Sequence, residues 1–326
     1  MANNTSFHEG FSCQPLSPTS AVIIGKIWAY SILIPASLFG NILTIVVIYA
    51  NKNLRRPLDF FIMNMAISNL FIPCVVLPYQ IVKTANNANY WLVDGLVGEF
   101  MCKFVFILAD MCPVVSIYSL IGMTGERFVA VIYGTKAPRN SITRRIVLIW
   151  ILSFILFTPY FYTFRLHRLN NNWYCLQRWS PLLDHVAAYR IHMTILVVVC
   201  IILPFCLLTA MYAVILITLT KCLPYFKPES KNGRERRYKA IRSTITQALA
   251  LVAVFGLCWG PYNVMVLVWG FVWNWSNFPS CDVRLLFICA QFMTYSDSCV
   301  SPSVYFIFFP RYKRAMKRVF NCRSVK

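Results

Sequence analysis

Four charged side chains lie well inside the long apolar stretches of this chain, away from the ends of those stretches, and they are the residues whose chemistry stands out. Glu126 and Arg127 are adjacent, Asp110 lies earlier in the same stretch, and Asp297 lies in the last one. A lone charge in apolar surroundings must be paired or protonated, and inside a membrane such a residue is usually functional. These positions therefore predict paired charges with a function. The alternative for Arg127 alone is a basic anchor at a membrane surface.

No catalytic constellation accompanies these charges, and no cluster of His and Cys has the spacing of a zinc site. We therefore expect a protein that is not an enzyme and that has no cofactor and no metal site of this kind. The formal charge of +20 indicates attraction to membrane surfaces and acidic partners. A nucleic-acid partner is not expected, because that function needs one basic face on a soluble fold.

The elements that position these charges are seven long apolar runs with almost no charged residues. A helix needs about 20 consecutive apolar residues to cross a bilayer, and lipid-exposed backbone must satisfy its own hydrogen bonds. The runs predict an all-α membrane protein, a bundle of seven transmembrane helices in one domain. Their expected positions are Ile23–Tyr49, Leu58–Val82, Phe100–Tyr133, Ile146–Tyr162, Tyr189–Thr220, Ile241–Trp273 and Leu285–Phe308.

Composition agrees with this class, since 58% of the residues are hydrophobic and 13% are charged, against about 25% charged in soluble domains. We expect three segments: an extracellular N-terminal segment, 1–22, a seven-transmembrane domain, 23–308, and an amphipathic helix with a short cytoplasmic tail, 309–326. The first twenty residues contain no Lys or Arg, so no cleavable signal peptide is expected and the first helix inserts as its own anchor.

Sidedness follows from the basic residues, which concentrate in the first, third and fifth connections and after the last run. The positive-inside rule then places the N-terminus outside the cell and the C-terminus in the cytoplasm of a plasma-membrane protein. Glycosylation sequons at Asn3, Asn4 and Asn274 all fall on the expected outer side.

Four of the thirteen cysteines fall on the expected outer side, namely Cys13, Cys102, Cys175 and Cys281. Only these thiols meet oxidising conditions. A bridge between Cys102 and Cys175 would tie the second outer loop over the bundle, and a bridge between Cys13 and Cys281 would pin the N-terminal segment. Counting alone leaves the other two ways of pairing them open.

Motifs in the order and spacing of these helices resemble those of a rhodopsin-like (class A) G-protein-coupled receptor over nearly the whole chain. The residues that carry the resemblance are Gly40 and Asn41, Cys102, Glu126-Arg127-Phe128, Trp150, Pro204 and Tyr212, Phe255, Cys258-Trp259, Pro261-Tyr262, and Ser301-Pro302 with Tyr305. The resemblance implies a peptide-receptor-like transducer that activates a heterotrimeric G protein.

The resemblance also implies a conformational switch. Arg127 would pair with Glu126 at rest and extend toward the G protein on activation, while ligand contact shifts Trp259 and Phe255. The cytoplasmic half of the sixth helix would then swing outward about Pro261, because proline removes a backbone hydrogen bond and bends the helix. The other switch residues implied are Pro204, Tyr212, Pro302 and Tyr305.

The chain departs from the family in its central polar residues. Asn69 stands where most members have a sodium-binding Asp, whereas Ser116 is retained. Asp297 lies one turn before Ser301, which replaces the usual Asn. We expect Asn69, Ser116, Asp297 and Ser301, with Asn41, to form one polar network, which makes a sodium site doubtful.

Two ligand classes are disfavoured by the sequence. No Lys lies in the seventh run to form a Schiff base, and Tyr295 occupies the matching place. Amine receptors carry an Asp where this chain has Ala109; Asp110 is adjacent, but one residue turns by about 100° on a helix. We therefore expect Asp110 to point away from an amine and a monoamine ligand to be disfavoured.

A peptide ligand is favoured by the second outer loop, where Asn170–Asn172 separates two runs of β-formers and predicts a hairpin. The candidate ligand-binding residues are Gln80, Trp91, Asp110, Arg178, Trp179, Tyr262, Gln291 and Tyr295. Belt or packing roles are the alternative for each aromatic residue. The alternatives for the protein are a class A receptor for an amine or lipid and, from another class, a membrane transporter.

The expected inner side carries a short basic loop, Cys222–Arg237, and a helix-like segment, Pro310–Phe320. The inner helix ends would admit a partner helix of the G protein. Pro310–Phe320 has an apolar face flanked by Lys and Arg and predicts a helix on the membrane lipid surface. Cys322 is a palmitoylation candidate, and only Ser324 follows it as a phosphorylation candidate, so we expect weak arrestin binding.

Overall fold

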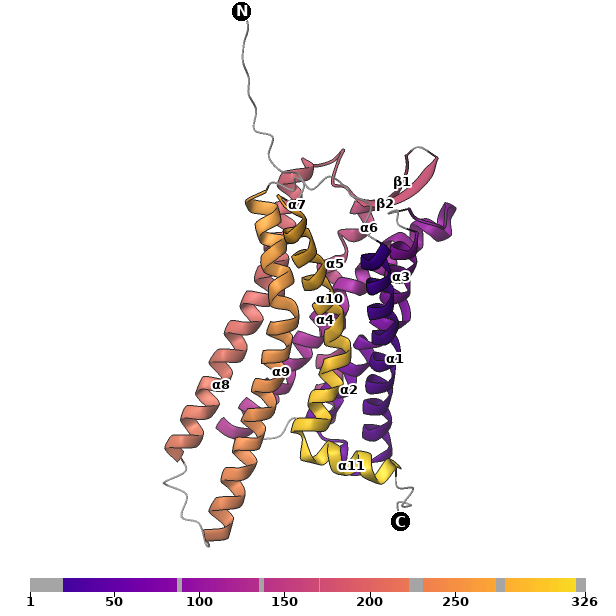
Figure 1. Ribbon diagram of the computed structural model, residues 1–326. Coiled ribbons are helices and arrows are strands. Elements are labelled where there is room, and N and C mark those ends of the chain that lie inside the picture. Colours follow the sequence, from indigo (N-terminus) through magenta and orange to yellow (C-terminus); the bar gives the residue numbers. More distant parts are fainter. Residues whose placement is uncertain are drawn as a thin grey trace, which may run out of the picture.

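The computed structural model describes residues 20–86, 90–134, 138–169, 171–222, 231–273 and 279–320. Long helices lie side by side in one bundle, with a two-stranded hairpin at one end and α11 lying across the other (Figure 1). These two ends are called the hairpin end and the α11 end. The expected all-α transmembrane fold is confirmed.

The first three apolar runs of the sequence form the first three crossings of the bundle. Helix α1 (Ser20–Ala50) is the first crossing, and a short turn, η1 (Lys52–Leu54), follows it. The second crossing is divided into α2 (Pro57–Asn69), a π-helical turn η2 (Ile72–Val76) and α3 (Leu77–Ala85). The third is α4 (Gly95–Ile132).

The remaining crossings enclose the hairpin connection. The fourth is α5 (Arg139–Phe157), with the single turn α6 (Tyr160–Thr163) after it. The fifth comprises α7 (His185–Val197), a π-helical turn η3 (Val198–Ile202) and α8 (Leu203–Cys222). Helices α9 (Lys231–Phe271) and α10 (Cys281–Phe308) are the sixth and seventh, and α11 is Pro310–Phe320.

Six of the crossings have both the length and the hydropathy of a membrane span, as found among the described residues: Ser20–Ala50, Pro57–Ala85, Gly95–Ile132, Asn140–Thr163, His185–Thr218 and Leu249–Phe271. Helix α10 is 28 residues long, enough to cross about 30 Å of hydrocarbon. It carries three charged residues, Asp282, Arg284 and Asp297.

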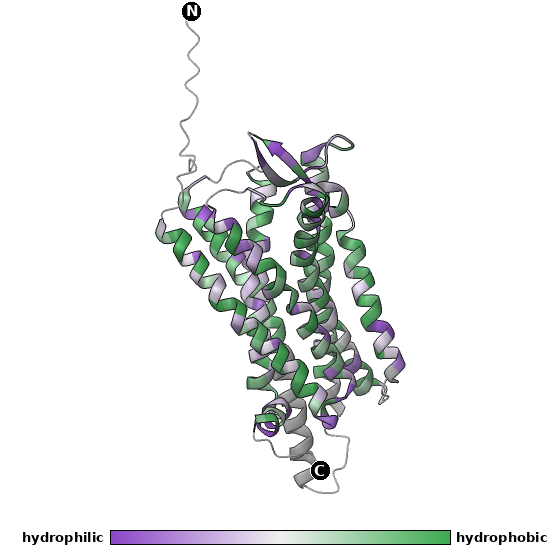
Figure 2. Cartoon of the chain, turned by 90° about the vertical axis from the view of Figure 1, so that its right-hand side faces the viewer, coloured by the Kyte–Doolittle hydropathy of each residue, from purple (hydrophilic) through white to green (hydrophobic). Residues whose placement is uncertain are grey.

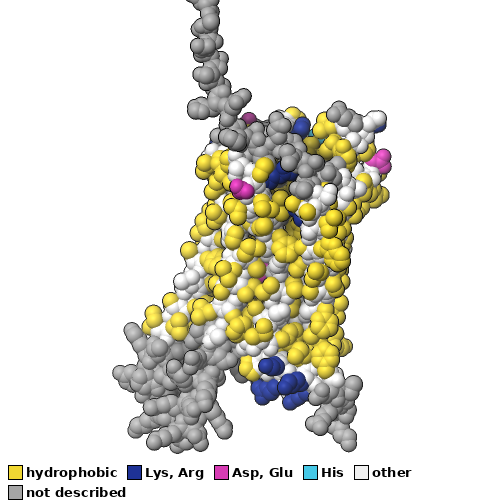
Figure 3. Space-filling model, in the orientation of Figure 1, with side chains coloured by type: hydrophobic (Ala, Val, Ile, Leu, Met, Phe, Trp, Pro, Cys, Tyr) yellow, Lys and Arg dark blue, Asp and Glu magenta, His cyan; other side chains and the backbone are white. Residues whose placement is uncertain are grey.

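The outer faces of the helices suit a lipid environment. Trp28 and Phe39 of α1 are 66% and 63% exposed, which a soluble protein would avoid over so large an area. Apolar residues run along the length of the helices (Figure 2) and cover the middle of the visible face of the bundle (Figure 3). Lys and Arg side chains gather instead near α11 (Figure 3).

The expected hairpin is confirmed. Strands β1 (Phe164–Leu169) and β2 (Asn172–Gln177) pair antiparallel, with Leu166 opposite Cys175. Asn171 has a positive φ of 66°, a conformation that Asn tolerates better than most residues. The predicted disulfide joins Cys102 at the start of α4 to Cys175 and therefore fastens the hairpin to the bundle.

Candidate functional site

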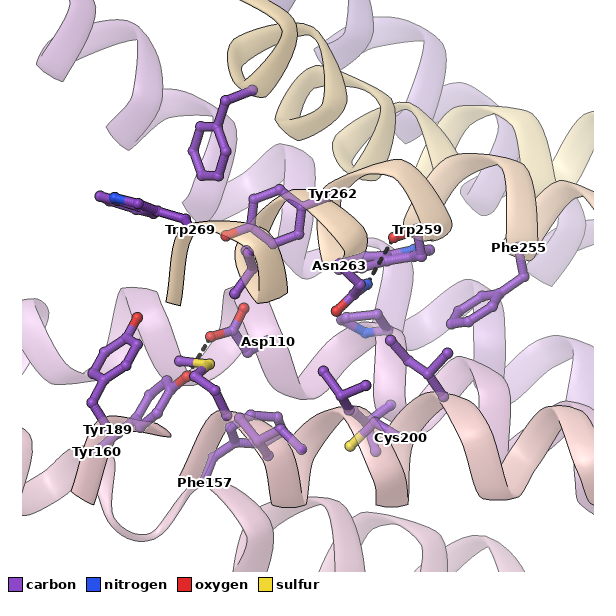
Figure 4. Close-up of a pocket in the computed structure, with 18 residues that line it drawn as sticks. Asp110, Phe157, Tyr160, Tyr189, Cys200, Phe255, Trp259, Tyr262, Asn263 and Trp269 are labelled. Carbon is purple, nitrogen blue, oxygen red and sulfur yellow. Dashed lines mark hydrogen bonds between the residues drawn. The ribbon is translucent and has the colours of Figure 1, made fainter. Parts of the chain in front are cut away.

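A cavity of about 130 Å³ lies among α4, α5, α6, α7, η3, α9 and α10 (Figure 4). Its size is close to that of an engineered cavity that takes one benzene molecule, so it suits a single side chain. The lining residues are Asp110, Pro113, Val114, Phe157, Tyr160, Tyr189, Met193, Leu196, Val197, Cys200, Ile201, Phe255, Trp259, Tyr262, Asn263, Val266, Trp269 and Phe287.

Asp110 is the one charged residue among the lining residues. Its Oδ2 accepts a hydrogen bond of 2.7 Å from the hydroxyl of Tyr160. Asp110 therefore faces the cavity, whereas the neighbouring Ala109 packs against the helix core and does not line it. The turn of about 100° between the two residues is real, but the cavity lies on the face of α4 that Asp110 occupies.

Tyr160 is held rigidly, because its ring is 2% exposed and packs against three other rings. Its ring centroid lies 5.4 Å from that of Phe157 and 4.8 Å from that of Phe164, both in edge contacts, and 5.8 Å from that of His192. Helix α5 ends at Phe157, Pro159 is the N-cap of the single turn α6, and α6 then leads into β1. The hairpin connection therefore sets the position of the Tyr160 hydroxyl.

The floor of the cavity, its part nearest the α11 end, is lined by Trp259 and, one turn further, by Phe255. The two rings are stacked with centroids 6.1 Å apart. The indole Nε1 of Trp259 donates to Asp297 Oδ2 at 3.3 Å, and Asn263 Nδ2 donates to the Trp259 carbonyl at 2.7 Å. A group that enters the cavity can therefore contact Trp259, which is hydrogen-bonded to Asp297 of α10.

The central polar residues form separate groups, so the single network that we expected was wrong for direct hydrogen bonds. Ser301 donates to Asp297 at 2.9 Å, whereas Ser116 donates to Asn69 at 3.2 Å. A third group is built by Asn41, whose amide donates to the carbonyls of Ser37 and Ser298 at 2.8 Å. Among the described residues no hydrogen bond joins Asp297 to Asn69.

Three predicted ligand contacts meet beside the cavity lining. The amide of Gln80 donates to the hydroxyl of Tyr295 at 2.8 Å, and the amide of Gln291 donates to the same hydroxyl at 3.3 Å. The Gln80 bond ties α3 to α10, and the Gln291 bond lies within α10. None of the three residues lines the cavity, whereas Tyr262 and Asp110 do.

The other three predicted ligand contacts lie around the hairpin. Trp91 is 7% exposed, and its backbone N–H donates to the carbonyl of Trp173 in β2 at 2.7 Å. The backbone of Arg178 donates to Thr163 at 2.7 Å, and Trp179, 9% exposed, accepts from Tyr162 at 3.2 Å through its carbonyl. Their backbones fasten the hairpin connection, and ligand contact by their side chains stays a prediction.

The α11 end holds the predicted switch residues. Glu126 is 8% exposed, and its carboxylate is bound by the guanidinium of Arg145 on α5, a partner that the sequence did not predict. Pairing of Arg127 with Glu126 stays a prediction. Tyr212 and Thr124 share a hydrogen bond of 2.8 Å that joins α8 to α4.

Two prolines of the predicted switch, Pro261 and Pro302, lie inside α9 and α10, and Pro204 lies in the first turn of α8. Tyr305 is fully buried, and its hydroxyl lies 3.6 Å from Met65 Sδ on α2. These positions agree with a bend near the floor of the cavity and with a packed tyrosine at the α11 end.

Asp59 of α2 joins α11 to the bundle. Its side chain is fully buried, accepts from Tyr312 at 2.9 Å and pairs with Arg311 at 3.2 Å. The backbone N–H of Arg56 adds a bond of 3.0 Å. Burial raises the pKa of Tyr312 well above its usual value, and the adjacent Asp59 charge raises it further. The hydroxyl therefore stays protonated as a donor.

The substitution Tyr312→Phe keeps the ring but removes this donor. We expect the free energy of unfolding of the protein to fall by about 1.5–3 kcal/mol, the range for hydrogen bonds to charged groups. Thermal or denaturant unfolding of purified protein would measure it. Tyr133→Phe is the matched control, because Tyr133 is 69% exposed; equal stabilities of the two variants would contradict the role of the Asp59 contact.

Several predicted residues lie outside the described residues, namely Asn3, Asn4, Cys13, Asn274, Cys322 and Ser324. Cys281 is disulfide-bonded. Among the described residues no group of three or more His, Cys, Asp or Glu side chains has the arrangement of a metal site.

Sequence reasoning missed Tyr160 and Tyr189 as lining residues and Arg145 and Asp59 as partners of other charges. Tyr160 follows Pro159 and precedes a predicted strand, which was a signal for a rigid turn above the bundle. Asp59 comes two residues after Pro57, which was a signal for an acidic first helical turn. Neither signal names a partner.

Comparison with known proteins gives consistent matches along the chain. The family model described as 7 transmembrane receptor (rhodopsin family) matches residues 40–305. Galanin receptor type 1 of Rattus norvegicus is 30% identical over 315 residues, which cover 93% of this chain and 82% of the relative.

Two further relatives are more distant. The substance-P receptor of Mus musculus is 23% identical over 325 residues, 98% of this chain and 76% of the relative. The QRFP-like peptide receptor of Branchiostoma floridae is 26% identical over 307 residues, 90% of this chain and 77% of the relative.

Proposed function

The chain belongs to the rhodopsin family of seven-transmembrane receptors, and from this membership we propose that it is a plasma-membrane receptor for an extracellular peptide. The hairpin end and the N-terminus face outward in this proposal, and the α11 end faces the cytoplasm and activates a heterotrimeric G protein. The names of the relatives support a peptide, since a galanin receptor, a substance-P receptor and a QRFP-like peptide receptor all match most of the chain. The basic residues support the orientation.

The observation that carries this proposal is the cavity lined by Trp259. A peptide side chain that enters from the hairpin end reaches a ring stacked on Phe255 and bonded to Asp297. A ligand shifts a receptor only by its preference for one state, and a shift from 1:99 to 99:1 needs about 5.5 kcal/mol. Contacts that differ between two positions of Trp259 can supply part of that preference.

The remaining assignments belong to the same proposal. Residues 1–22 form the extracellular segment with glycosylation at Asn3 and Asn4, residues 23–308 the receptor domain with a further site at Asn274, and residues 309–326 the membrane-surface helix and tail. Helix α11 supports the last assignment, because Tyr312 and Ala315 are buried while Lys and Arg occupy its other faces. Palmitoylation of Cys322 would strengthen lipid binding. Arrestin binding is weak.

The test is a peptide library applied to membranes from cells that express the chain together with G proteins, with guanine-nucleotide exchange as the readout. The expected result is stimulated exchange by a defined set of peptides. Surface labelling of intact cells should detect residues 1–20 and not the C-terminus. Exchange stimulated only by non-peptide compounds, or radiotracer uptake in place of exchange, would contradict the proposal.

Sodium is expected to leave agonist affinity unchanged, because Asp297 already accepts from Ser301 and Trp259 and the neutral Asn69 bonds Ser116. The measurement compares agonist binding in sodium chloride and in choline chloride at equal ionic strength. Asp297→Asn, which removes the only acid of the central polar groups, should leave the comparison unchanged. A sodium-dependent loss of affinity in the unmodified receptor would contradict this expectation.

A further inference from the structure

The carboxylate of Asp110 is placed to bind a charged ligand group. One oxygen accepts from Tyr160, and among the described residues no Lys or Arg lines the cavity around it. We propose that Asp110 anchors a cationic side chain of the ligand, the guanidinium of an arginine or the ammonium of a lysine, inside this aromatic cavity. This inference rests on the proposed peptide function and adds the chemistry of the residue that enters the receptor.

The charge of the site favours a cation over other groups. An anionic group in the cavity would be repelled by Asp110, since like charges in a region of low dielectric cost several kcal/mol. An apolar group would exclude water and leave a carboxylate without a cation, which is the expensive state of a buried charge. A cation supplies the missing partner and forms charge-assisted hydrogen bonds.

The walls around Asp110 favour the same group. The phenol rings of Tyr189 and Tyr262 lie near Asp110 on two sides of the cavity (Figure 4). The ring of Phe287 lies 5.5 Å from those of Tyr262 and Trp269, which builds an aromatic wall above it. Aromatic faces attract cations, and a planar guanidinium also stacks on them.

The size and depth of the cavity limit what enters. Its volume of about 130 Å³ holds one side chain and excludes a folded peptide. Trp259 lines the floor of the same cavity, so a long side chain that reaches Asp110 also approaches it. Binding of the cation and contact with the proposed switch are therefore coupled through one residue of the peptide.

The experiment uses pools of short amidated peptides in pairs, with arginine or lysine fixed at one position in one pool and the neutral isosteres citrulline or norleucine in its partner. Stimulated nucleotide exchange is measured on membranes with the unmodified receptor. We expect the active pools to be basic and to lose about 10- to 100-fold in potency on neutralisation, as for a lost hydrogen bond to a charged group.

Asp110→Asn should remove the preference, so that the basic pool and its neutral partner become equally potent. Asp282→Asn is the matched variant, because Asp282 is exposed at the start of α10, and it should keep the preference. Surface labelling and the response to neutral pools confirm that Asp110→Asn folds. Equal potency of paired pools on the unmodified receptor, or loss of the preference with Asp282→Asn alone, would overturn the inference while leaving a peptide receptor in place. Activation by non-peptide compounds only would instead overturn the proposed function.

Discussion

Arg127→Ala abolishes agonist-stimulated nucleotide exchange and leaves agonist binding unchanged. Arg127 lies 17 residues after Asp110 on α4, a distance of about 25 Å along a helix. The substitution therefore leaves the cavity intact. It removes the cation beside Glu126, whose carboxylate is held by Arg145, at the end where the G protein is proposed to bind.

The measurement pairs agonist binding with nucleotide exchange on the same membranes. Arg144→Ala is the matched control, because Arg144 is an exposed arginine near the same end of the bundle, and it should retain exchange. Arg127→Lys separates charge from shape, since lysine keeps the charge but loses the planar fork of donors. Full exchange by Arg127→Ala would remove Arg127 from the proposed switch. Loss of binding would instead indicate a folding role.

Substitutions at Arg145 add a second arm to this test. Glu126 is 8% exposed, whereas the Arg145 side chain is 42% exposed, so loss of Arg145 leaves a buried acid without this partner. If Arg127 and Arg145 both bind Glu126, Arg145→Gln frees the carboxylate for Arg127 and lowers exchange without abolishing it. The exposed neighbour Arg144 again supplies the control.

The helices were predictable from sequence because a bilayer imposes length and apolarity on every crossing. Helix α11 begins at Pro310 and ends at Phe320, as the amphipathic pattern predicted. Other boundaries shifted, since α9 begins at Lys231, ten residues before the first apolar residue of the predicted run. Polar residues continue a helix beyond the lipid, and hydropathy does not detect that extension.

The site was less predictable because its geometry depends on how the helices rotate against one another. Ala109 and Asp110 differ in direction by about 100°, as expected for successive residues of a helix. No sequence pattern, however, indicates which face of α4 borders the cavity. The contacts of Asp59 with Arg311 and Tyr312 span more than 250 residues of sequence, and Asn69 and Asp297 had only their shared depth in favour of a contact. Depth predicts the layer of a residue and leaves its neighbours open.

Loss of the Cys102–Cys175 disulfide is the second large effect. The bond joins the start of α4 to β2 across 73 residues of sequence, and removal of such a bond typically costs about 2–5 kcal/mol of stability. The hairpin also carries Phe164, which stacks on Phe106 with centroids 4.3 Å apart and contacts Tyr160. Loosening of the hairpin is therefore expected to displace Tyr160 and, through its hydrogen bond, Asp110.

Cys102→Ser, Cys175→Ser and the double variant should lose stability to similar extents, because each breaks the same bond. Agonist affinity should fall with stability, since the wall of the cavity depends on the hairpin. Cys206→Ser and Cys289→Ser are the matched controls, because both thiols are free and exposed in the described structure, and they should leave both measurements unchanged.

Two other contacts also fasten the hairpin to the bundle, and they limit how much stability and agonist affinity the disulfide variants lose. Glu99 of α4 accepts from the backbone of Leu166 at 2.9 Å, and Trp91 donates to Trp173 at 2.7 Å. If these contacts alone hold the hairpin over the cavity, the disulfide variants lose stability but keep agonist affinity. That outcome would separate the covalent tie from the cavity and would contradict the route from Cys175 through Phe164 and Tyr160 to Asp110. The geometry predicts that stability and agonist affinity fall together in each single variant and in the double variant.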